Sequence, residues 1–139
     1  MIILDTNVLS EVLRPVPEPS VLDWLTNQPR ASLFITTVTR GEILYGIRLL
    51  ADGKRRQGLW DAARKIFDAD FADQVLSFDG DAADMFADIA ATRRRAGKPI
   101  SQFDAMIVAM ARSRGASLAT RNVKDFEECG VDIIDPWMA

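Results

Sequence analysis

The sequence contains no histidine and only one cysteine, Cys129. A single cysteine cannot form an intramolecular disulfide, and without histidine the chain has no set of zinc ligands. This composition fits a reducing compartment, and we expect a cytoplasmic protein. Histidine is also excluded as a catalytic base. If the chain is an enzyme, its chemistry therefore rests on carboxylates and a bound cation.

Long apolar runs and a strong net charge are absent as well. No run approaches the ~18 residues that span a membrane, and the N-terminus lacks the basic start and apolar stretch of a secretory signal. The net charge of −3 does not indicate a nucleic-acid binder, although local patches decide phosphate binding. The 139 residues, nearly half of them apolar, predict one domain over residues 1–139 with a sizeable core.

Short apolar segments alternate along the chain with helical patterns. The apolar segments predict strands over residues 2–4, 32–36, 75–78, 117–120 and 132–134. The helical patterns, most of which end at proline or glycine, predict helices over residues 8–13, 20–28, 38–50, 55–70, 80–96, 101–114 and 123–128. This alternation predicts a three-layer α/β/α sandwich with a mostly parallel central sheet.

Four acids stand at the edge or in the middle of apolar segments: Asp5, Glu42, Asp104 and Asp125. Asp5 directly follows a strand, and ligands bind at that edge of a parallel sheet. Asp104 lies on the face that its helix should bury. Glu42 has no basic neighbour one helical turn away. Each acid also has a purely structural interpretation, because a buried aspartate can bond backbone groups or cap a helix.

Capping leaves alternatives open at two of these positions. Thr6 or Asn7 could cap the first helix in place of Asp5, and Asn122 or Asp125 could cap the short helix at 123–128. Taken together, however, clustered carboxylates repel one another unless a cation holds them. Oxygen-only ligands suit Mg²⁺ or Mn²⁺. Such ions activate water and stabilise charge on a phosphodiester.

Four segments in order resemble the motifs of PIN-domain ribonucleases, in particular the toxins of the VapC and FitB type. The first is Met1 to Glu11, the second surrounds Glu42, the third runs from Asp104 to Ala109 and the fourth from Ala119 to Phe126. The tail Asp135-Pro136-Trp137 resembles that of one branch of these toxins. The similarity extends from end to end of the chain.

This resemblance implies a metal-dependent endoribonuclease that is the toxin of a type II toxin–antitoxin pair. Its substrate would be tRNA, rRNA or mRNA, and its cofactor Mg²⁺ or Mn²⁺. Its partner would be a VapB- or FitA-like antitoxin that blocks the site and binds operator DNA, so that the toxin meets DNA only through the antitoxin. The resemblance also implies a homodimer and no association with membranes.

Carried over residue by residue, the resemblance makes Asp5, Glu42 and Asp104 the core of a metal site. Family members differ at the fourth position. We favour Asp125, because it keeps the negative charge, with Asn122 as a neutral helper. Thr6 is expected to hold a metal-bound water or a phosphate oxygen.

Basic residues offer candidate RNA contacts: Arg121 beside the fourth motif, and Arg93 and Arg94 near a helix end. The arginines at 93–95 also favour the helix C-terminus itself. We interpret Trp24, Trp60 and Trp137 as core or interface anchors. The helices at 8–13 and 21–25, together with the long helix after Thr37, are expected to form a groove for an antitoxin segment.

Other functions remain in competition with this one. A haloacid-dehalogenase-like phosphatase also begins with an aspartate after a strand, but it requires a second aspartate where this chain has Asn7. A catalytically degenerate PIN-like module that only binds a DNA-binding antitoxin would share the fold. A DNase would use the same acids. The retained carboxylates argue against the degenerate module.

Overall fold

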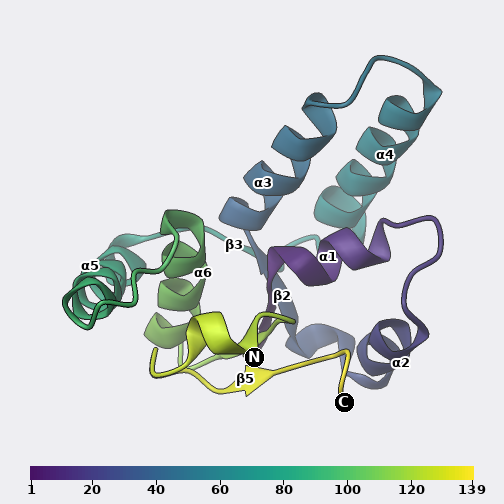
Figure 1. Ribbon diagram of the computed structural model, residues 1–139. Coiled ribbons are helices and arrows are strands. Elements are labelled where there is room, and N and C mark those ends of the chain that lie inside the picture. The colour runs from purple at the N-terminus through teal and green to yellow at the C-terminus, as the bar shows by residue number, and fades with distance from the viewer.

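The computed structural model describes all 139 residues, and a five-stranded parallel sheet forms its centre (Figure 1). The strand order is β3-β2-β1-β4-β5, and every neighbouring pair is parallel. The strands are short: β1 (Ile2–Leu4), β2 (Leu33–Thr36), β3 (Val75–Leu76), β4 (Ser117–Ala119) and β5 (Ile133–Ile134). The predicted strands are confirmed, and the sheet is wholly rather than mostly parallel.

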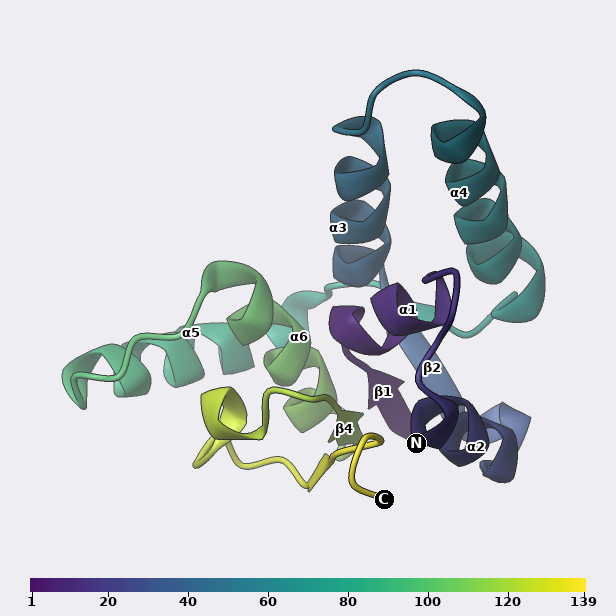
Figure 2. The same ribbon diagram turned by 45° about the vertical axis from the view of Figure 1, so that its right-hand side comes forward.

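Six α-helices connect the strands: α1 (Thr6–Val12), α2 (Pro19–Asn27), α3 (Thr37–Arg48), α4 (Lys54–Lys65), α5 (Gly80–Arg95) and α6 (Gln102–Ser113). Three short turns complete the chain: η1 (Arg30–Ser32), the π-helical η2 (Ile66–Asp70) and the 3₁₀ turn η3 (Val123–Phe126). None of the helices is long and apolar enough to cross a membrane. Figures 1 and 2 show α3 and α4 as a hairpin that projects from the body.

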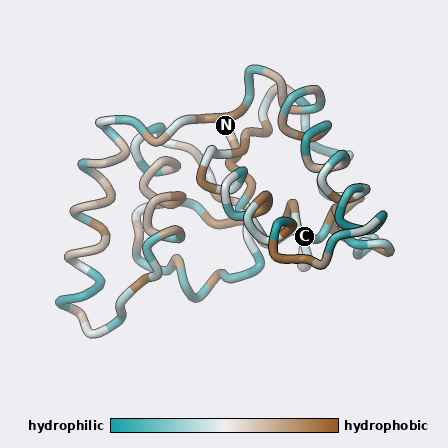
Figure 3. The backbone as a smooth tube through the Cα atoms, turned by 90° about the horizontal axis from the view of Figure 1, so that it is seen from above, coloured by the Kyte–Doolittle hydropathy of each residue, from teal (hydrophilic) through white to brown (hydrophobic).

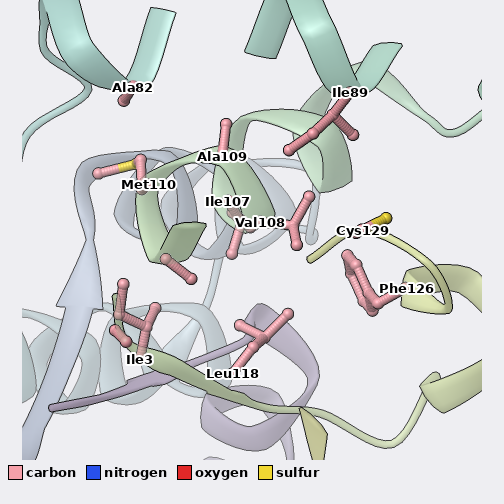
Figure 4. Close-up of a cluster of buried hydrophobic side chains, with 12 residues drawn as sticks. Ile3, Ala82, Ile89, Ile107, Val108, Ala109, Met110, Leu118, Phe126 and Cys129 are labelled. Carbon is pink, nitrogen blue, oxygen red and sulfur yellow. The ribbon is translucent and has the colours of Figure 1, made fainter. Parts of the chain in front are cut away.

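Two apolar clusters on opposite faces of the sheet make the three layers. Successive side chains of a strand point to opposite faces, so Ile3 belongs to one cluster and Leu4 to the other. The first cluster packs β1 and β4 against α5, α6 and η3, with Ile107, Leu118 and Phe126 among its members (Figure 4). The second packs the sheet against α1 to α4. The predicted three-layer arrangement is confirmed.

Apolar residues gather toward the middle of the molecule, and the outer turns of the helices are largely hydrophilic (Figure 3). Trp24, Trp60 and Trp137 all pack, partly buried, against the second cluster. Their interpretation as core anchors is confirmed.

Three predicted boundaries are corrected. The first helix begins at Thr6 rather than at residue 8, because Asp5 caps it instead of Thr6 or Asn7. The helix predicted over 55–70 ends at Lys65 and continues as the wider η2 turn. The helix predicted over 123–128 is only the four-residue η3.

Candidate active site

Asp5 occupies the centre of an acidic pocket at the carboxyl edge of the sheet. It follows β1 directly, and one oxygen accepts a hydrogen bond of 2.8 Å from the Thr6 amide as the cap of α1. The other oxygen accepts from the Thr120 hydroxyl at 2.7 Å and from the Asn7 amide nitrogen at 3.3 Å. The side chain is only 3% exposed, so its orientation is fixed by its neighbours.

Thr120 follows β4 and sets the position of Asp5. Its side chain is fully buried, and its hydroxyl accepts hydrogen bonds from Asn7 Nδ2 at 3.2 Å and from the Asn122 amide at 3.1 Å. A threonine hydroxyl has one hydrogen to donate, and with both acceptor positions filled it donates to Asp5. The hydroxyl therefore uses its full hydrogen-bonding capacity at the site.

Burial raises the pKa of Asp5 from its ordinary 3.8 to about 6. The hydrogen bonds from Thr120 and Thr6 lower that pKa, and the charges of Asp104 and Glu42 raise it further. A carboxylate that is buried near two other acids lacks positive compensation. The site therefore favours a cation or a proton at Asp5.

Glu42 and Asp104 reach the pocket from helices on opposite faces of the sheet. Glu42, on α3, accepts a hydrogen bond of 2.8 Å from the Thr6 hydroxyl, which is also 2.9 Å from the buried Thr39 hydroxyl. Asp104 lies in the first turn of α6, which Ser101 caps. The Asp104 carboxylate has neither a hydrogen bond nor an ion pair within the protein. It is therefore free to accept a ligand.

The pocket has a volume of about 280 Å³ and is open on one side. Its walls come from four parts of the chain: Asp5, Thr6, Asn7, Ser10, Glu42, Asp104 and Asn122. No lysine or arginine lines it. As the side chains stand, no three acids are close enough to hold one ion in common. Pairs of carboxylates with intervening water are the arrangement that this geometry supports.

The structure brings together three of the four predicted acids and does not bring Asp125 with them. Asp125 is exposed on η3, where its backbone bonds to Asn122 and Arg93. Asn122 takes the fourth place, and its side-chain amide has no partner within the protein. The preference for Asp125 over Asn122 is therefore not supported by this arrangement. Thr6 also lines the pocket, and its hydroxyl donates to Glu42; its predicted contact with a metal-bound water or a phosphate oxygen stays a prediction.

The arginines predicted to contact RNA lie outside the pocket. Arg93 joins the end of α5 to η3 through hydrogen bonds to the Lys98 and Asp125 carbonyls, at 2.8 and 2.7 Å, and it also contacts Cys129. Arg94 is exposed. Arg121 lies over the ring of Trp137. Arg93 and Arg121 thus have contacts within the fold that the sequence patterns did not predict.

Sequence reasoning missed Thr120 and Asn7 as site residues. Asn7 lies two residues after Asp5, and Thr120 directly follows an apolar strand as Asp5 does. That shared position is the signal that could have identified Thr120. Which atoms they bond depends on β1 and β4 being neighbours, and this becomes visible only in the folded chain.

A cavity lies between two of the three helices that were predicted to form a groove, and its third wall differs from the predicted one. This cavity, of about 490 Å³, lies between α1 and α2, where Leu9, Val12 and Leu25 line it. Ile66 and Phe71, in and next to η2, close the other side. The helix after Thr37, α3, contributes no residue to this cavity.

A parallel α/β/α fold with an acidic pocket at the carboxyl edge of its strands is typical of domains in which carboxylates form the functional site. The PIN domain profile matches residues 2–130. The chain belongs to the PIN domain family.

Several relatives match over nearly the whole chain. The plasmid stability protein StbB of Pseudomonas syringae pv. tomato is 40% identical over all of both chains. The VapC ribonuclease Y4jK of Sinorhizobium fredii is 37% identical, over 99% of this chain and 98% of its own. Among solved structures, FitAB bound to a DNA fragment named IR36 contains a chain that superposes with a TM-score of 0.91 at 34% identity. That match covers 99% of this chain and 96% of the other.

Proposed function

We propose that this chain is a metal-dependent endoribonuclease, the toxin of a type II toxin–antitoxin module, and that it hydrolyses RNA phosphodiester bonds at the acidic pocket. The observation that carries the proposal is the convergence of Asp5, Glu42 and Asp104 on one open pocket without a basic side chain. The 37% identity to a relative named as a VapC ribonuclease favours RNA as the substrate. A substrate of this kind places its action in the cytoplasm.

The donor atoms of the pocket fit Mg²⁺ or Mn²⁺. All its candidate ligands are oxygens, and Mg²⁺ is commonly held by one or two carboxylates while it keeps several waters. Asp5 would hold the ion together with Asp104 or Glu42, and the Asn122 side chain would complete the set. The pKa of Asp5 at about 6, raised chiefly by burial, gives that carboxylate a strong preference for a positive neighbour. When bound, such an ion activates water and stabilises charge on the phosphate.

The protein's own groups orient the carboxylates. Thr120 and the Thr6 amide fix the two oxygens of Asp5, and the Thr6 hydroxyl fixes Glu42. Asp104 stands unpaired at the start of α6. The pocket is open to solvent, so a single RNA strand in an extended conformation can lie across it with a phosphate next to the carboxylates.

The fourth position distinguishes two versions of the site. We place Asn122 there because its side chain lines the pocket, and Asp125 is the alternative that keeps the charge. Comparing Asn122→Ala with Asp125→Asn decides between them. A loss of cleavage in the first variant alone supports Asn122, and a loss in the second alone supports Asp125.

We also propose that the chain forms a homodimer and that a VapB- or FitA-like antitoxin covers it. The apolar groove between α1 and α2 suits an amphipathic partner segment. The FitAB complex, which is bound to DNA, supports a partner that carries the DNA contact. Leu25→Glu, in the wall of this groove, should reduce copurification with the antitoxin, and unchanged copurification would argue against the groove.

Cleavage of total cellular RNA tests the central proposal. Purified protein is compared with Asp104→Asn, each with Mg²⁺, with Mn²⁺ and with EDTA. Discrete fragments that appear only for the unmodified protein with metal support a selective ribonuclease. Absence of cleavage by two equally well folded proteins supports the degenerate binding module. Competition between single-stranded RNA and DNA of one sequence then separates an RNase from a DNase.

A further inference from the structure

Trp137, near the C-terminus, contacts α2 and the segment that follows β4. Its amide donates a hydrogen bond of 2.9 Å to Asp135, and its carbonyl accepts one of 3.4 Å from the Ser20 hydroxyl on α2. The ring is partly buried against the cluster that contains β1 and α1. Figure 1 shows this segment, in yellow, running from β5 toward α2. The Asp135 bond forms a turn within the tail, and the Ser20 bond attaches the tail to α2.

The ring of Trp137 supports the side chain of Arg121. The guanidinium carbon lies 5.2 Å from the ring centroid, within the range of a cation–π contact. Arg121 is also close enough to Glu11 to contribute to the lowered pKa of that carboxyl, after the larger effects of the Glu18 amide and Arg14. The Trp137 ring is therefore the direct contact of the Arg121 side chain, and the negative charge of Glu11 lies near it.

Arg121 sits between the two residues that connect β4 to the acidic pocket. Its backbone amide donates to Asn7 Oδ1 at 3.4 Å, and Asn7 Nδ2 in turn donates to Asp5. On either side of it, Thr120 orients Asp5 and the Asn122 side chain lines the pocket. A shift of Arg121 would therefore move three of the groups that surround the Asp5 carboxylate.

We infer that Trp137 is a positioning residue for the acidic site. By holding the Arg121 side chain, it fixes the segment 120–122 and thereby the orientation of Asp5 and Asn122. We call the pair Arg121 and Trp137 the C-terminal latch. The inference rests on the proposed function, since it assigns the latch to the same metal site. It gives a role to the tail motif, which lies more than a hundred residues from Asp5 in sequence.

The latch and a direct RNA contact make different demands on Arg121. A phosphate contact needs only the positive charge of Arg121, and Trp137 would then be dispensable. The latch needs both partners, so Trp137→Ala and Arg121→Ala should have equal effects and the double variant no further effect. Trp137→Phe keeps an aromatic face and should behave like the unmodified protein.

Hydrogen exchange in the metal-free protein provides the first test. The Arg121 and Asn122 amides donate to side-chain oxygens, Asn7 Oδ1 and Thr120 Oγ1. In Trp137→Ala these two amides should exchange roughly tenfold faster, because the segment opens locally. Trp60→Ala is the matched control, since Trp60 carries Arg48 at 4.2 Å in the same kind of contact on the distant α3–α4 hairpin. Unchanged exchange at both amides in Trp137→Ala overturns the latch.

Binding of Mn²⁺, measured by calorimetry, provides the second test. Residues that orient a metal ligand typically contribute tenfold or more to metal affinity. Trp137 acts through Arg121 and so lies one contact further from the ligand. We therefore expect roughly fivefold weaker Mn²⁺ binding in Trp137→Ala and in Arg121→Ala. Trp60→Ala and Trp137→Phe should bind as the unmodified protein does. A lower unfolding midpoint with unchanged Mn²⁺ affinity would show a purely structural role and overturn the inference.

The two tests separate failure of the latch from failure of the proposed function. If the unmodified protein binds no Mn²⁺, the proposed metal site is wrong, and the exchange rates alone decide whether the segment 120–122 depends on Trp137. If Arg121→Ala weakens RNA binding while Trp137→Ala changes neither RNA binding nor Mn²⁺ affinity, Arg121 is a phosphate contact and the latch is refuted. Because Arg121 is exposed, its replacement leaves the core intact even if Trp137→Ala folds poorly.

Discussion

Replacing Asp5 by asparagine should stabilise the metal-free protein at neutral pH. Burial raises the pKa of this carboxyl from 3.8 to about 6. The folded state therefore holds the proton more tightly than the unfolded state does. Proton binding at Asp5 therefore stabilises the folded state. This contribution is fully present below pH 3.8 and is lost as the pH rises through 6. Above that pH the folded protein carries a buried negative charge without compensation.

The magnitude follows from the same two values. Each tenfold change in a protonation equilibrium corresponds to about 1.4 kcal/mol, so ionisation of Asp5 costs the folded state roughly 3 kcal/mol at pH 7.5, of which about 2.4 kcal/mol accumulates above pH 4. Asparagine resembles the protonated acid in shape and stays neutral. Its amide has only one acceptor oxygen, so it keeps either the bond from Thr6 or the bonds from Thr120 and Asn7. The lost hydrogen bonding offsets part of the gain, which is therefore expected between about 1 and 3 kcal/mol at pH 7.5.

Urea unfolding from pH 4 to pH 7.5 in EDTA measures the effect. The quantity to compare is the difference in unfolding free energy between Asp5→Asn and the unmodified protein, because the other acids cancel in that difference. It should grow by about 2 kcal/mol between pH 4 and pH 6.5 and should level off at higher pH. Asp23→Asn makes the same chemical change at an exposed site on α2 and should give a flat profile. A flat profile for Asp5→Asn, or a variant less stable at pH 7.5, would refute the reasoning.

Three further changes test other parts of the structure. Asp104→Asn should reduce RNA cleavage at least about a hundredfold with an unchanged circular dichroism spectrum, and undiminished cleavage would contradict the assignment of this acid. Thr120→Val removes the hydroxyl that orients Asp5; Mn²⁺ binding should weaken about tenfold in calorimetry, whereas Thr120→Ser should retain it. Phe126→Ala empties a site that is 1% exposed and should lower the unfolding free energy by about 3–5 kcal/mol. A cost below about 1 kcal/mol in urea unfolding would show that η3 contributes little to the first cluster.

The layers of the fold could be predicted from the sequence because each strand is a short apolar run and each helix carries an apolar face. The π-helical turn at Ile66–Asp70 could not. The helical apolar pattern continues through it, and its Phe67 packs into the second cluster just as Ala63 of α4 does, so the periodicity does not mark where the α-helix ends. The end of the last predicted helix was wrong for a similar reason, since capping residues alone do not give the length of η3.

Two acids of the candidate site could be predicted because their own neighbours in the sequence identify them. Asp5 follows a strand, and Asp104 interrupts an apolar helix face, so both could be identified without coordinates. The choice between Asn122 and Asp125 depends on the path of a few residues after β4, which no periodicity describes. Thr120 was missed because its hydrogen bonds reach residues more than a hundred positions away.

The central position of β1 affects the order in which the chain can fold. Its neighbour β4 begins at Ser117, and the hydrogen bond from Thr120 to Asp5 spans 115 residues of sequence. Contacts between such distant segments form slowly, and in a chain emerging from the ribosome they cannot form until the later segment exists. About 120 residues must therefore be translated before Asp5 can be oriented, so an interrupted translation product leaves the acidic pocket unassembled.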